Sequence, residues 1–170
     1  NMLGVIPVMA LRAHRQAEVR HFLRASGAAA YLIPDIVGGF DFRVMAGQMQ
    51  AEFTALKHVL VAGDPAPGQL ALSSLPAAAA PMAGPRPADV STMLLSGGTT
   101  SLSKLIPRTH DDYVLNARLC GAAAGFTDRT VLLAILPLGH NYNLASPGML
   151  GAFYHGGTVV LAPGGSVDDV

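Results

Sequence analysis

The residues with the clearest chemical potential form one short stretch rich in glycine, serine and threonine. It follows an apolar segment, 90–95, and ends at a lysine. Glycine lacks a Cβ, so its backbone can turn N–H groups toward an anion and approach it closely. The hydroxyl groups add donors, and the lysine ammonium adds a mobile positive charge. Together they suit a polyphosphate, and they are Ser96, Gly97, Gly98, Thr99, Thr100, Ser101 and Lys104.

A second polar cluster follows an apolar run at 130–136 and contains His140, Asn141, Tyr142 and Ser146. A planar ligand with hydroxyl and carboxylate groups could use the tyrosine ring as a wall and the amide and hydroxyl as hydrogen-bond partners. The same residues also fit a purely structural role, because asparagine is common at turns. The spacing alone therefore leaves both interpretations open.

The glycine-rich stretch also has a structural alternative, a flexible loop whose lysine faces water. It is not a Walker A loop, which requires a lysine followed by serine or threonine and then a helix. Here Lys104 is followed by Leu-Ile-Pro, and the signal for a helix start comes later, at Thr109.

Two longer strings carry a family resemblance. The string SGGTTSLSKLIPRTHDDY, from Ser96 to Tyr113, resembles the phosphate-loop motif of the adenylate-forming enzymes, in particular the stand-alone aryl-acid ligases of siderophore biosynthesis. The string LPLGHNYNLASPGMLGAFYHGGTVVLA resembles the acyl-acid pocket of 2,3-dihydroxybenzoate-activating ligases. The resemblance is firm from Val90 to Ala162 and looser before that.

The resemblance implies roles for the residues of both clusters. The loop, with Lys104, would bind the β- and γ-phosphates of ATP, and Mg²⁺ would be bound mainly by those phosphates and not by protein ligands. His140 would lie near the substrate carboxylate, which makes His140 and Lys104 the candidate catalytic residues. Tyr142 would line the ring pocket, and Asn141 and Ser146 would face the aryl hydroxyls.

The activity implied is that of a 2,3-dihydroxybenzoate-AMP ligase. Such an enzyme forms an acyl-adenylate and pyrophosphate from the acid and ATP, and then transfers the aryl group to the phosphopantetheine thiol of an aryl carrier protein. Salicylate-activating relatives tend to carry cysteine where this chain has Ser146, so the hydroxyl favours 2,3-dihydroxybenzoate. The alternatives are a salicylate-AMP ligase, a non-catalytic nucleotide- or phosphate-binding module, and a remnant that folds only against the rest of a ligase.

Two loop residues depart from the family pattern. Most relatives have glycine where Ser101 stands and proline where Ser103 stands. If the first position requires a positive φ, a serine there costs roughly 1 kcal/mol or more.

Composition excludes several classes of function. Eleven basic and eleven acidic residues cancel, so no nucleic-acid partner is expected. The single cysteine, Cys120, excludes an internal disulfide framework, suits a reducing cytoplasm and is expected to be a small core residue. The apolar start of the chain is too short to span a bilayer and is interrupted by Pro7, so no membrane association is expected.

Apolar runs and helical patterns alternate along the chain, which predicts an α/β fold with a layered, mostly parallel sheet flanked by helices. It would form part of the large N-terminal domain of an adenylate-forming enzyme, whose C-terminal remainder is absent. Three segments are expected, an α/β segment at 1–64, a Pro/Ala-rich linker or loop at 65–89, and a segment at 90–170 with the phosphate loop and aryl-acid pocket. The strands are predicted at 4–11, 28–33, 90–95, 130–136 and 158–162, with a further apolar run at 56–61, and the helices at 12–25, 42–53, 109–124 and 143–154.

Overall fold

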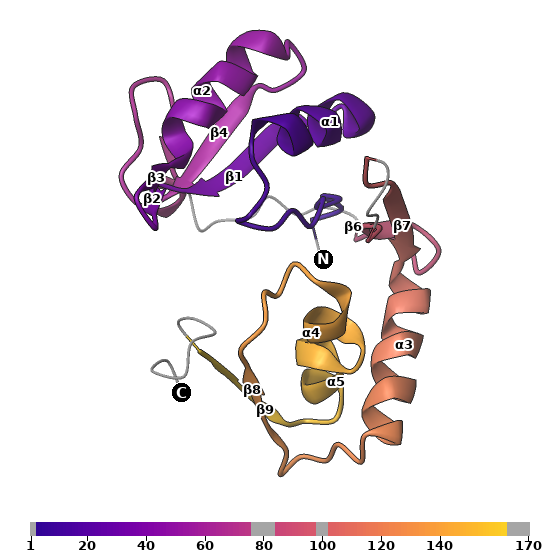
Figure 1. Cartoon of the computed structure of the whole chain (residues 1–170). Coiled ribbons are helices and arrows are strands. Elements are labelled where there is room, and N and C mark those ends of the chain that lie inside the picture. The colour runs from indigo at the N-terminus through magenta and orange to yellow at the C-terminus, as the bar shows by residue number, and fades with distance from the viewer. Residues whose placement is uncertain (1–2, 76–83, 98–101, 163–170) are drawn as a thin grey trace. The chain divides into compact units, whose positions relative to one another are not determined.

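The computed structural model describes residues 3–75, 84–97 and 102–162 and divides the chain into two compact units (Figure 1). Residues 14–82 form the first, which we call the inserted unit. Residues 1–13 and 83–170 form the second, which we call the split unit because two separate stretches of chain build it. The mixture of helices with parallel strands confirms the predicted α/β class. The predicted boundaries after residues 64 and 89 stay a prediction.

The inserted unit is a parallel sheet with helices packed against it. Strand β1 (Ala30–Pro34) runs parallel to β4 (His58–Ala62), and β4 runs parallel to β5 (Leu70–Ala71), in the order β1-β4-β5. Helix α2 (Phe42–Glu52) crosses between β1 and β4, and α1 (Gln16–Ser26) packs beside α2. The described residues of this unit also form three minor elements, the antiparallel pair β2 (Ile36–Val37) and β3 (Phe40–Asp41), and the 3₁₀ turn η1 (Leu72–Ser74).

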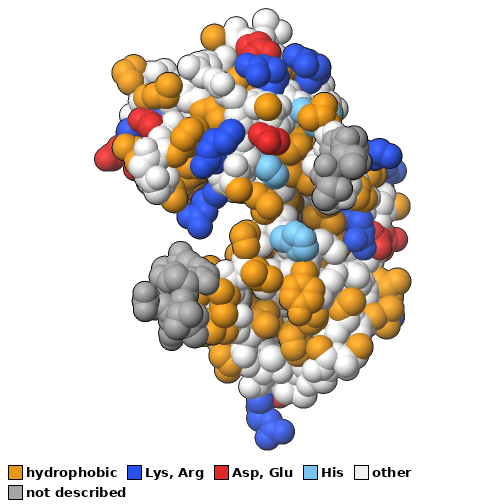
Figure 2. Space-filling model, viewed as in Figure 1, with side chains coloured by type: hydrophobic (Ala, Val, Ile, Leu, Met, Phe, Trp, Pro, Cys, Tyr) orange, Lys and Arg blue, Asp and Glu red, His pale blue; other side chains and the backbone are white. Residues whose placement is uncertain are grey.

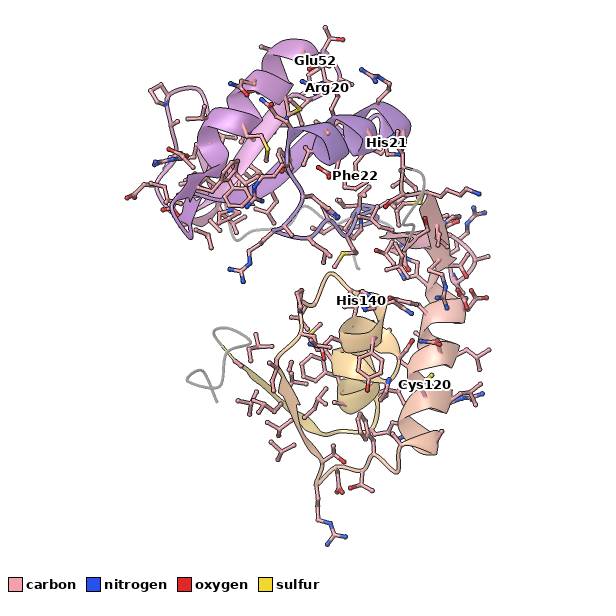
Figure 3. The ribbon with its side chains drawn as sticks, viewed as in Figure 1. Arg20, His21, Phe22, Glu52, Cys120 and His140 are labelled. Atoms are coloured by element: carbon pink, nitrogen blue, oxygen red, sulfur yellow. The ribbon has the colours of Figure 1, made fainter. Side chains whose placement is uncertain are left out.

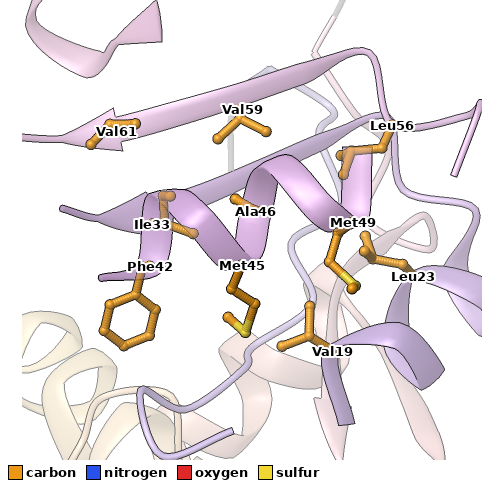
Figure 4. Packing of buried hydrophobic residues seen from close by; sticks show 10 residues of the cluster. All are labelled: Val19, Leu23, Ile33, Phe42, Met45, Ala46, Met49, Leu56, Val59 and Val61. Atoms are coloured by element: carbon orange, nitrogen blue, oxygen red, sulfur yellow. The ribbon is translucent and has the colours of Figure 1, made fainter. Parts of the chain in front are cut away.

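The core of the inserted unit lies between α1, α2 and the strands (Figure 4). The apolar residues of α1 and α2 recur at helical spacing, and alternate residues of β4 point inward, as each period requires. At the surface, the Arg20 guanidinium pairs with the Glu52 carboxylate at 2.8 Å and joins the two helices (Figure 3). The buried cluster consists of Val19, Leu23, Ile33, Phe42, Met45, Ala46, Met49, Leu56, Val59 and Val61.

The split unit begins with a hairpin and a long helix. Strands β6 (Val90–Leu95) and β7 (Leu105–Thr109) pair antiparallel, and α3 (His110–Ala123) follows directly. The N-terminal stretch adds a single parallel bridge, Val8 to Met93.

The rest of the split unit is a second helical crossover between parallel strands. Strand β8 (Val131–Ala134) leads through α4 (Asn141–Ala145) and α5 (Gly148–Tyr154) to β9 (Thr158–Leu161), which pairs with β8 in parallel. Helix α5 packs against α3 and also against β8 and β9 (Figure 1).

Two sequence-based predictions of secondary structure are wrong. Residues 4–11 form one bridge and no strand, because Pro7 has no N–H to continue a ladder. The predicted helix 143–154 is two helices, since Pro147 supplies no N–H and Gly148 adopts a positive φ of 46°. Within the stretch 65–89, whose role as a linker or loop stays a prediction, the structure forms β5 and η1. Strand β7 was not predicted at all.

We expect Met49→Ala to lower the free energy of unfolding by about 2–5 kcal/mol, because the Met49 side chain is fully buried and its removal leaves a cavity. Urea unfolding followed by circular dichroism measures the change. The matched control is Val44→Ala on the same helix, whose side chain is 61% exposed. That change should stay within about 0.5 kcal/mol of the wild type, and equal losses for the two variants would contradict this core.

Candidate active site

The predicted phosphate loop is the connection of the β6–β7 hairpin, and two hydrogen bonds close its base. The Ser96 amide donates to the Lys104 carbonyl at 3.0 Å, and the Lys104 amide donates to the Ser96 hydroxyl at 2.8 Å. Gly97 and Lys104 are exposed. The structure thus fixes both ends of the loop, while four of the predicted residues lie outside the described residues: Gly98, Thr99, Thr100 and Ser101.

Helix α3 begins as its sequence predicts. The Thr109 hydroxyl accepts the Asp112 amide at 3.4 Å, and two carboxylates lie in the first turn, where the helix dipole favours negative charge. The Arg108 guanidinium donates to the Asp112 carboxylate and keeps the pKa of that carboxylate below its usual range. Residues just after the loop therefore fix the start of the helix that supports the second cluster.

His140 caps the start of α4 (Figure 3). Its Nδ1 accepts the Tyr142 amide at 3.3 Å, so in the neutral ring Nε2 carries the proton and is the donor. The Tyr142 side chain is 59% exposed. The cap thus makes Nε2 the donor of the neutral His140 ring, and Tyr142, two residues along the chain, is accessible.

Asn141 and Ser146, which were both predicted to face aryl hydroxyls, are hydrogen-bonded to each other. The Asn141 Nδ2 donates to the Ser146 Oγ at 3.1 Å. The Tyr113 hydroxyl donates to the Asn141 Oδ1 at 2.8 Å. Asn116 donates through Nδ2 to the Ser146 Oγ at 3.1 Å and to the Ala145 carbonyl at 2.7 Å. The structure brings these two predicted residues into one network.

Sequence reasoning missed the supporting face of α3. Tyr113, Asn116 and Cys120 lie three and four residues apart and so share one side of the helix. The Cys120 thiol contacts the Asn116 Oδ1 at 3.6 Å, so Cys120 belongs to the margin of this network (Figure 3). The sequence does contain one signal of this network. Asn116 follows an apolar stretch of a predicted helix, and an amide near a buried face needs a hydrogen-bond partner because an unpaired one is costly.

Tyr113 anchors the network in an apolar environment. The residue is 6% exposed, and burial raises the pKa of its hydroxyl above the usual range. The Arg108 guanidinium lies 4.9 Å from the centre of its ring and opposes part of that shift. The hydroxyl is therefore a neutral donor to Asn141 over the physiological pH range.

A cavity of about 560 Å³ lies beside this network within the split unit. Tyr113 and Leu144 line it, but none of the residues predicted to contact an aryl acid does. The His110 Nε2 at its wall is buried and has no hydrogen-bond partner among the described residues. The remaining walls are mostly apolar and are formed by Pro7, Met9, Ser91, Thr92, Val114, Ala117, Leu150, Phe153 and Tyr154.

No three side chains of the metal-ligating types gather closely enough to hold an ion in the described part of the chain. Within the same ranges, no helix is long and apolar enough to cross a membrane.

Comparison with known proteins decides the family. A family model described as AMP-binding enzyme matches residues 1–170, the whole chain. The chain belongs to the AMP-binding enzyme family. The sequence-based resemblance to adenylate-forming enzymes is thereby confirmed.

The similar proteins of this family include aryl-acid ligases. The chain is 47% identical to a 2,3-dihydroxybenzoate-AMP ligase of Bacillus subtilis over 98% of its own length and 31% of that protein. It is 45% identical to a salicyl-AMP ligase / salicyl-S-ArCP synthetase of Mycobacterium tuberculosis over 94% of its length and 29% of that protein. The chain thus spans about 30% of the length of these relatives.

Solved structures agree with this assignment. The apo structure of MbtA from Mycobacterium smegmatis matches with a TM-score of 0.82 and 41% identity, over 91% of this chain and 29% of that one. The anthranilate CoA ligase AuaEII in complex with anthranoyl-AMP matches with a TM-score of 0.82 at 24% identity, over 96% of this chain and 31% of that one. The second likeness shows the fold alone.

We expect Tyr113→Phe to remove the part of the free energy of unfolding that falls at alkaline pH as the Tyr113 hydroxyl ionises. Because the folded-state pKa is raised, the hydroxyl's contribution is present below pH about 10 and is lost as the pH rises through the folded value. Unfolding free energies measured by urea titration from pH 8 to 11 should show the wild type losing its advantage over the variant. Parallel pH profiles for the two proteins would contradict this account.

Proposed function

We propose that this chain is the part of an aryl-acid AMP ligase that holds the ATP phosphates and the aryl acid. The observation that carries the proposal is the hydrogen-bonded cluster of Asn141, Ser146 and Asn116 at α4, the short helix that also carries the exposed Tyr142. A hydroxylated benzoate requires polar partners and an aromatic wall, and this helix supplies residues of both kinds. The similarity to ligases named for 2,3-dihydroxybenzoate and salicylate supports this choice of substrate class.

In the proposed reaction a carboxylate oxygen of the acid bonds to the α-phosphorus of ATP. The bond from that phosphorus to the bridging oxygen breaks, and pyrophosphate leaves. Two anions must approach each other, so the protein contributes mainly positioning and charge neutralisation. His140, with Nε2 as donor, is assigned to the carboxylate, and Tyr142 to the ring.

The phosphate loop suits ATP. Two hydrogen bonds between Ser96 and Lys104 close its base, where Gly97 and Lys104 are exposed. We assign Ser96, Gly97, Lys104 and residues 98–101 to the β- and γ-phosphates. Mg²⁺, when bound, would neutralise phosphate charge and would be bound by those phosphates.

The second half-reaction would transfer the aryl group to the phosphopantetheine thiol of a carrier protein and release AMP, as in siderophore biosynthesis. The process requires ATP and a reduced thiol, so we place it in the cytoplasm.

We expect ATP–pyrophosphate exchange by the full-length polypeptide that contains this chain to prefer 2,3-dihydroxybenzoate over salicylate. Ser146→Cys should shift the preference toward salicylate by about tenfold, because a thiol is a poor partner for a second phenolic hydroxyl. Ser74→Cys, at an exposed serine of η1, is the control and should leave the ratio unchanged. A wild type that prefers salicylate would favour the salicyl-AMP ligase alternative.

We expect the 170-residue chain alone to form no aryl-adenylate, because about two thirds of each relative lies outside the matched region. Calorimetric titration with ATP·Mg²⁺ and with 2,3-dihydroxybenzoate separates the alternatives. Binding of the acid supports the proposal, binding of the nucleotide alone supports a phosphate-binding module, and binding of neither supports a structural remnant. Adenylate formation by the isolated chain would contradict the expectation.

A further inference from the structure

The Ser146 hydroxyl has both of its acceptor positions in use. A hydroxyl has two lone pairs and one O–H donor. The Asn141 Nδ2 and the Asn116 Nδ2 each donate to its oxygen at 3.1 Å. Among the described residues, none accepts the Ser146 proton. The hydroxyl can therefore still donate a hydrogen bond, but it cannot accept a third one well.

Other contacts fix the direction of both amides. The Asn116 Nδ2 also donates to the Ala145 carbonyl at 2.7 Å, and a carbonyl oxygen can only accept. The Asn141 Oδ1 accepts from the Tyr113 hydroxyl at 2.8 Å. A turned Asn116 would point its oxygen at the Ala145 carbonyl oxygen, and a turned Asn141 would leave the proton of the buried Tyr113 hydroxyl without an acceptor among the described residues. The donor character of Ser146 is thus built into the fold.

We propose that Asn116 is a specificity-determining positioning residue that makes Ser146 an obligate hydrogen-bond donor to the substrate. The inference rests on the proposed function, in which Ser146 faces a ring substituent of the aryl acid. The substituent at that position must then be an acceptor, such as a phenolic oxygen. An aromatic amine is a poor acceptor, because its lone pair is delocalised into the ring. Its N–H groups would also face the Ser146 O–H, so that two donors would point at each other without an acceptor.

Asn116→Asp provides the test because it replaces the donor by an acceptor of similar shape. The introduced carboxylate accepts the Ser146 proton and frees a lone pair of Oγ, which can then accept from an amine. The variant also loses the hydrogen bond to the Ala145 carbonyl, a loss that Asn116→Leu shares. Asn116→Leu, which removes the donor without adding a charge, is a second variant in case the first folds poorly. The probes are 2,3-dihydroxybenzoate and 3-amino-2-hydroxybenzoate.

The measurement is the ratio of kcat/KM for the two acids in the full-length polypeptide at neutral pH. We expect the wild type to prefer the dihydroxy acid, and Asn116→Asp to lower that ratio by about tenfold. In a Ser146→Ala background the same substitution should change the ratio by less than about twofold, because the effect is transmitted only through Ser146. A purely structural role for Asn116 would not depend on Ser146.

Gln50→Glu is the matched control, an amide-to-acid change on a helix whose amide also donates to a backbone carbonyl, that of Lys57. It should leave the ratio unchanged. If both Asn116 variants are active and the ratio is unchanged, the inference is wrong but the proposed function stands. The same holds if the full effect of Asn116→Asp persists in the Ser146→Ala background. A folded wild type that adenylates no aryl acid overturns the proposed function and the inference with it.

Discussion

The close approach of α3 and α5 is the constraint on which the split unit depends. A Cβ at Gly121, on α3, would lie 2.5 Å from the His155 Cδ2 at the end of α5. A Cβ at Gly151, on α5, would lie 3.4 Å from the Ala117 carbonyl oxygen of α3 and 2.9 Å from the Pro147 Cβ at the start of its own helix. Only glycine fits at both positions without displacing a neighbour, so the helices meet almost backbone to backbone. Ala117, one helical turn before Gly121 on α3, is buried. This contact brings one face of α3 against the start of α4 and makes the polar network possible.

The two clusters of the candidate site are held by different means. Two hydrogen bonds between Ser96 and Lys104, one between backbone groups and one from the Lys104 amide to the Ser96 hydroxyl, hold the ends of the phosphate loop. Side-chain amides and a tyrosine hydroxyl hold the residues around Ser146. A satisfied side-chain network specifies one donor pattern before any ligand arrives. The network around Ser146 is therefore preorganised by the fold.

Local signals in the sequence predicted much of this. The cap at Thr109, the helices of the inserted unit and the family resemblance depend on neighbouring residues and are confirmed. The roles of individual loop residues stay predictions. Strand β7 contains Pro107, which hid it, and the bond from Asn116 to Ser146 joins residues 30 apart, which no local pattern reports. The break at Gly148 was visible as Pro-Gly but was outweighed by the apolar helical spacing around it.

The discontinuity of the split unit has a consequence for biosynthesis. The Thr92 hydroxyl donates to the Pro7 carbonyl across 85 residues, so the first stretch of this unit emerges from the ribosome long before its partner. The inserted unit is continuous from 14 to 82 and can complete its core in that interval. Translation order therefore favours folding of the intervening piece first, while the leading segment waits unpaired. A pause in synthesis ahead of β6 would prolong the exposure of that segment to chaperones.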